Sequence, residues 1–100
     1  MPSKMCGQAV QLPAAGYQQL DTINGMCDVT YVNQTNGSTN IVADAGNATE
    51  AATAESSGLY AQAAAVGAAV YKLRLNPSRT WIKWNGTTVG ANRHNFLISW

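Results

Sequence analysis

Short segments in which apolar and polar residues alternate constrain this chain of 100 residues more than any other feature. The clearest of them, 70–75, carries three apolar residues that alternate with two bases, in the order Tyr71, Lys72, Leu73, Arg74 and Leu75. Successive side chains of a strand point to opposite faces, so this period predicts a strand with one buried face. The C-terminal third is therefore expected to be β-structure.

Two further strands are predicted after this segment. Residues 76–79 indicate a turn, because a proline presets φ at its first central position. Residues 80–84 return as a strand, Asn85-Gly86 makes a second tight turn into residues 87–89, and residues 95–100 form the last strand. Together these segments predict an antiparallel meander at the centre of the structure.

Residues 26–44 predict a β-hairpin. The segment 26–32 alternates in polarity, and the segment 39–43 is apolar enough to return as its partner strand. Asn36-Gly37 lies between them and supplies the positive φ values that a tight connection needs.

Residues 48–56 predict a short Ala-rich helix. Asn47 precedes it as the N-cap, with Glu50 at the third helical position, a spacing like that of a capping box. Gly58 is placed to close its C-terminal end. The Ala-rich segment 59–70 stays open between helix and strand, and we expect it to pack against the protein's own sheet rather than against a second subunit.

Residues 1–19 indicate an extended N-terminal arm, because prolines, glycines and glutamines interrupt any helical or strand period. Residues 20–100 are then expected to form one domain, which suits a chain of this length. The expected fold is mainly β: a small antiparallel sheet, sandwich or barrel-like domain with one short Ala-rich helix and this arm.

The few charged residues are sorted by sign along the sequence. They make up 11% of the chain, against roughly 25% in an ordinary soluble domain. All acids precede residue 56 and, apart from Lys4, all bases follow residue 71. Such a dipolar chain favours head-to-tail contact between identical subunits. The alternative is that these few charges are sorted in this way by accident, because the strands are short.

This pattern predicts an interface built from both signs of charge and from aromatic side chains. The candidate acids are Asp28, Asp44, Glu50 and Glu55, and the candidate bases are Lys72, Arg74, Arg79 and Lys83. The candidate aromatic anchors are Trp81, Trp84, Phe96 and Trp100.

No segment indicates a membrane anchor, a signal peptide or a metal centre. The apolar segment 61–71 is shorter than the roughly 18 residues that a membrane span needs. Cys6 and Cys27 are widely spaced, and the single histidine, His94, is distant from both, so no metal or other cofactor is expected. Cytoplasmic synthesis with reduced thiols is expected, and a disulfide within or between subunits is the alternative.

One stretch resembles a known family. Trp84-Asn85-Gly86-Thr87-Thr88 is similar to the Trp-Asp-Gly-Thr-Thr stretch of the head-decoration (cement) proteins of lambda-like tailed phages, with Asn85 in place of Asp. The N-terminal arm and the charge-poor body rich in Ala, Gly and Thr look like that family too. The resemblance implies a β-rich homo-oligomer, a trimer, that binds a shell of major capsid protein in the virion. It implies no catalytic residues, so an enzyme is not expected.

Binding of single-stranded nucleic acid is the main alternative. Bases are interleaved with aromatic residues across one predicted hairpin, and such platforms bind single strands; the residues concerned are Lys72, Arg74, Arg79, Lys83 and Trp81. The strand period places most of these bases and aromatics on different faces, and a pI near 7.8 is low for such a module.

A surface-display or adhesin subunit is the third hypothesis. Four Asn-X-Ser/Thr sequons would mark glycans in a secreted protein, at Asn33, Asn36, Asn47 and Asn85. The absence of a recognisable signal peptide favours turn chemistry as their explanation.

Overall fold

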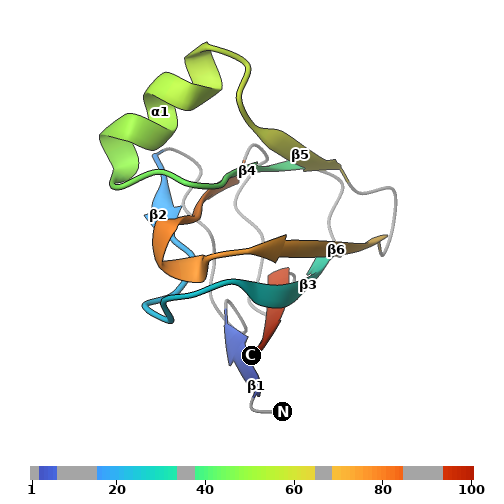
Figure 1. Ribbon diagram of the computed structural model, residues 1–100. Coiled ribbons are helices and arrows are strands. Elements are labelled where there is room, and N and C mark those ends of the chain that lie inside the picture. Colours follow the sequence, from blue (N-terminus) through green and yellow to red (C-terminus); the bar gives the residue numbers. More distant parts are fainter. Residues whose placement is uncertain (1–2, 7–15, 34–37, 65–68, 85–93) are drawn as a thin grey trace.

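The computed structural model describes residues 3–6, 16–33, 38–64, 69–84 and 94–100 (Figure 1). These residues form eight strands, one α-helix and one turn of 3₁₀-helix. In chain order they are β1 Ser3–Cys6, β2 Gln18–Gln19, β3 Cys27–Asn33, β4 Ser38–Val42, α1 Ala48–Ser56, β5 Ala61–Ala64, β6 Ala69–Leu75, η1 Pro77–Arg79, β7 Trp81–Trp84 and β8 His94–Ser99.

The strands form two four-stranded sheets. Sheet A has the order β1-β8-β3-β6 and sheet B has the order β2-β7-β4-β5, with every pair of neighbours antiparallel. Each connection between consecutive described strands leads to the other sheet, except the one between β4 and β5, which passes through α1. This is the strand order of an eight-stranded jelly roll. The expectation of a mainly β fold with one short helix is confirmed.

The predicted pairing of the strands is wrong. β3 and β4 do not form a hairpin, because β3 pairs with β6 and β8 while β4 pairs with β5 and β7. The meander fails in the same way, since β7 lies in the sheet opposite to β6 and β8. Alternation shows which side of a strand is buried, but two stacked sheets bury that side without pairing strands that follow one another. The predicted Asn-Gly turns at 36–37 and 85–86 lie outside the described residues.

Two pieces of the predicted N-terminal arm are strands. β1 pairs with β8 at the edge of sheet A, and β2 pairs with β7 at the edge of sheet B. Both are short, and edge pairing requires only backbone hydrogen bonds on one side, so no alternation marks them in the sequence. Residues 7–15 lie outside the description.

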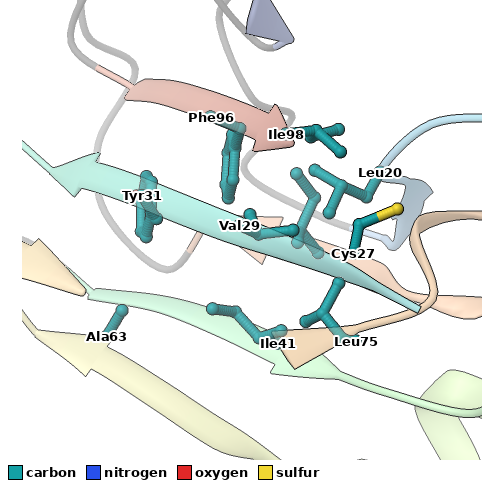
Figure 2. Close-up of a cluster of buried hydrophobic side chains, with 10 residues drawn as sticks. Leu20, Cys27, Val29, Tyr31, Ile41, Ala63, Leu75, Phe96 and Ile98 are labelled. Carbon is teal, nitrogen blue, oxygen red and sulfur yellow. The ribbon is translucent and has the colours of Figure 1, made fainter. Parts of the chain in front are cut away.

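The main core lies between the two sheets (Figure 2). Sheet A contributes the inner side chains of β3, β6 and β8, and sheet B contributes those of β4, β5 and β7; they are Cys27, Val29, Tyr31, Leu75, Phe96, Ile98, Ile41, Ala63 and Ile82, with Leu20 beside them. The Cys27 thiol is free and buried, and it donates a hydrogen bond to the Gly25 carbonyl. The sequence left residues 59–70 open between helix and strand, and the structure shows strands there, β5 and the start of β6.

An aromatic row crosses the inner face of sheet A. Tyr31 is the register partner of both Tyr71 and Phe96, and its ring stacks on Phe96 with centroids 4.2 Å apart. The hydroxyls of Tyr31 and Thr39 share a buried hydrogen bond of 2.6 Å, which joins sheet A to sheet B. Burial raises the pKa of Tyr31 to about 12.

Helix α1 forms where the sequence predicts it. The Asn47 side chain accepts a hydrogen bond of 2.9 Å from the Glu50 N–H, while the Glu50 carboxylate accepts one from the Gly46 N–H. Gly58 ends the helix with φ +77°, and the Leu59 N–H donates to the Ala54 carbonyl.

The helix covers the outer face of sheet B, as Figure 1 shows. Beneath it lies a second, smaller apolar cluster of Val42, Ala45 and Ala51, with Tyr17, Ala54 and Trp81 against it. No described element covers the outer face of sheet A. The two faces of the sandwich therefore differ.

Candidate functional site

The charges that are sorted along the sequence pair within the folded chain. Antiparallel pairing of β3 with β6 makes Asp28 and Arg74 register partners, and Arg74 Nη1 lies 3.0 Å from Asp28 Oδ1. Arg79, in η1, pairs with Asp44, which follows β4, and Arg79 Nε lies 3.2 Å from Asp44 Oδ1. Both pairs join the acidic half of the sequence to the basic half. These charges are neutralised within one subunit. They therefore give no support to the predicted head-to-tail contact between subunits, which stays a prediction.

A third pair anchors α1 to sheet B. Lys83 Nζ lies 2.7 Å from Glu55 Oε1, and the Tyr17 hydroxyl donates a hydrogen bond to the other carboxylate oxygen. The Lys83 ammonium also lies 5.2 Å from the centre of the Tyr17 ring. The hydrogen bonds from Lys83 and Tyr17 lower the pKa of Glu55, while burial, followed by the bond to Glu55, raises the pKa of Tyr17 above its usual range. The groups satisfy one another, so the cluster positions the helix.

Two of the predicted interface charges, Glu50 and Lys72, are not part of these ion pairs. Glu50 caps the start of α1 through its contacts with the Gly46 N–H and the Asn47 amide. Lys72 is exposed on the outer face of sheet A beside Thr30, and it makes no ion pair within the part of the chain that the structure describes.

The predicted aromatic anchors separate into different environments. Phe96 is 1% exposed between the sheets, so its assignment to an interface is wrong. Trp81 is half-buried under α1, where its indole N–H donates to the Ala45 carbonyl at 3.0 Å. Trp100 is 42% exposed and is available for contact. The side chain of Trp84 lies outside the description.

The predicted basic and aromatic platform is not brought together on one surface. Lys72 and Arg74 lie on the outer face of sheet A, whereas Trp81 and Lys83 lie on the outer side of sheet B, against α1. These are opposite faces of the sandwich. A single strand of nucleic acid lying on one face would meet only part of the set.

The described residues do bring together an apolar groove at one edge of the sandwich. The edge strands β6 of sheet A and β5 of sheet B lie on the same side of the molecule, and a groove of about 400 Å³ runs between them. Its walls are mainly apolar and include Leu59, Tyr60, Ala61, Leu73 and Leu75, with Arg74 at its edge. A volume of this size lies within the range of small binding sites.

Large apolar side chains are exposed around the groove and along β6. Leu59 is 69% exposed and Val70 is 60% exposed, and Tyr60 is also exposed. Sequence reasoning did not select these residues, because the Ala-rich context of 59–70 left the choice between helix and strand open. The available signal was the pair of large apolar residues that follows Gly58 directly, just beyond the helix end.

Neither metal ligands nor a membrane span are found in the described segments. No group of three His, Cys, Asp or Glu side chains there could hold a metal ion. No helix among them is long and apolar enough to cross a membrane.

No protein-family model matches the chain, and neither a curated protein nor a solved structure shows significant similarity to it.

Proposed function

We propose that the protein is a structural subunit of a virion that acts through protein–protein contacts on a capsid shell. The observation that carries this proposal is the strand order β1-β8-β3-β6 opposite β2-β7-β4-β5. Jelly rolls with this order are a recurrent architecture of viral capsid domains, and also of lectins and cupins. Because one fold serves many functions, this support is an analogy between folds.

The exposed apolar side chains favour an assembly role within that range of functions. Single exposed apolar residues are common on monomers, but neighbouring ones usually mark a contact surface. Here Leu59 and Tyr60 adjoin an apolar groove, and Val70 lies on the outer face of the strand that borders it. A small domain with few charges gains stability when a partner covers such a surface.

The specific form of the proposal is a capsid decoration (cement) protein, a homo-oligomer such as a trimer that binds a major capsid protein. It comes from the similarity at 84–88, of which residues 85–88 lie outside the description. The proposal includes the virion as the place of action and assigns no catalysis to the protein.

Light scattering of the purified protein at low and high salt, with electron microscopy of the same samples, tests this function. We expect a defined oligomer or a closed particle. Leu59→Glu places a charge on a side chain that the fold already exposes, so the variant should fold and associate less. Thr53→Glu adds the same charge to the exposed face of α1 and is the matched control. A wild-type monomer at every concentration and salt would overturn the proposal.

A further inference from the structure

Strand β6 lies at the edge of sheet A among the strands that the structure describes. All seven of its residues pair with β3 on one side, and no described strand pairs with it on the other. In an antiparallel pair the N–H and C=O groups of every second residue point away from the partner strand. The edge therefore offers a row of backbone donors and acceptors to an additional strand.

The two sides of this edge differ in chemistry. On the inner side, Leu73 and Leu75 face the groove whose opposite wall holds Leu59 and Tyr60. On the outer side lie Lys72 and Arg74, both exposed. Among the described residues the Arg74 guanidinium makes one hydrogen bond, from Nη1 to Asp28, while the side chain remains 62% exposed. A guanidinium has five N–H donors, so Arg74 can bind a second carboxylate.

We propose that the β6 edge binds an extended segment of a partner protein in which large apolar residues alternate with acidic ones. The segment adds a fifth strand to sheet A through backbone hydrogen bonds. Its apolar side chains point inward and fill the groove, and its acidic side chains point outward and meet Lys72 and Arg74. This inference rests on the proposed function and deepens it, because it gives the chemistry of the neighbour that the subunit contacts.

A second copy of β6 is a poor occupant of the same edge. Edge-to-edge pairing of two copies would bring the Lys72 side chains, which have no ion pair among the described residues, onto one continuous outer face, whereas each Arg74 already pairs with Asp28. Like charges on neighbouring strands are destabilising, whereas an acidic strand has the opposite effect. The charge on this edge therefore selects an acidic partner.

The direct test is an NMR titration of the ¹⁵N-labelled protein with a short synthetic peptide in which valine and glutamate alternate. We expect shifts in the amides of residues 70–75 and in those of Leu59, Tyr60 and Ala61. The same peptide with N-methylated backbone amides should not bind, since it cannot complete the strand. A peptide in which valine and lysine alternate should bind more weakly or not at all.

Two variants separate the two kinds of contact. Lys72→Glu should weaken binding of the glutamate peptide by about tenfold and favour the lysine peptide, because it converts an attraction into a repulsion. Leu59→Ser removes one wall of the groove and should weaken both peptides. Thr53→Glu on α1 should change neither.

Shifts confined to β1 or to the open face of sheet A would overturn the inference, as would equal binding of the N-methylated peptide. An absence of shifts at the highest peptide concentration would do the same. Light scattering distinguishes this failure from failure of the proposed function. An oligomer that forms equally well with Lys72→Glu and with Leu59→Ser would show assembly through another surface.

Discussion

Lys83 Nζ lies 2.7 Å from Glu55 Oε1, and this contact joins the last turn of α1 to the outer face of sheet B. The two side chains are only 22% and 25% exposed, so water screens their attraction less than at an open surface. Tyr17 adds its hydroxyl to the same carboxylate. The helix is thus held at its C-terminal end by charge and hydrogen bonding, and along its length by small apolar contacts.

Removal of one member of this pair should destabilise the fold. Lys83→Met leaves the Glu55 carboxylate partly buried without its cation, and we expect a loss of about 1–2 kcal/mol in the free energy of unfolding. Urea denaturation measures it. Arg74→Met is the control, because the Asp28–Arg74 pair is 64% and 62% exposed, and its loss should cost less than about 1 kcal/mol. Equal losses in the two variants would contradict the structural role of Glu55.

The same carboxylate predicts a loss of stability in acid. The pKa of Glu55 is lowered from its usual value of 4.5 in the folded state, so near that pH the unfolded chain binds more protons than the folded one. Its contribution is fully present above pH 4.5 and is lost as the pH falls through the lowered value. In urea denaturation at several pH values, the stability difference between wild type and Glu55→Gln should therefore shrink below pH 4.5. A difference that stays constant down to low pH would contradict this prediction.

Local signals in the sequence were sufficient for the helix and for the main strands. Asn47, Glu50 and Gly58 specify both ends of α1 through contacts within a few residues. The alternation in β6 specifies its buried side in the same local way. Such features depend on neighbours along the chain, and a single sequence displays them directly.

The pairing of the strands and the location of the site depend on contacts distant in sequence. Asp28 and Arg74 are 46 residues apart, and only the topology makes them neighbours. The sorting of charges along the sequence therefore did not predict how the charges are distributed on the folded surface. The groove beside Leu59 combines β4, β5 and β6, which no local pattern brings together. The N-terminal strands β1 and β2 are short and show no alternation of apolar and polar residues in the sequence.

Loss of the hydrogen bond between Tyr31 and Thr39 should lower the free energy of unfolding. Tyr31→Phe leaves the Thr39 hydroxyl, which is 0% exposed, without this partner. We expect a loss of about 1–3 kcal/mol in the free energy of unfolding. The double variant Tyr31→Phe, Thr39→Val removes both polar groups and should recover part of this loss. A double variant that is less stable than Tyr31→Phe would contradict the interpretation of an unpaired hydroxyl.

Phe96 and Trp100 lie four residues apart, and replacing each by alanine should affect a different property. The Phe96 variant should lose stability, and the Trp100 variant should lose association. Phe96 packs on Tyr31 between the sheets, so Phe96→Ala should cost about 3–5 kcal/mol of stability, measured by thermal or urea unfolding. Trp100 is 42% exposed, so Trp100→Ala should leave the folded subunit nearly as stable and should weaken association in light scattering. A Trp100→Ala variant that associates like the wild type would remove Trp100 from the contact surface. Leu59→Glu, which acts beside the groove, would then be the variant that locates the interface.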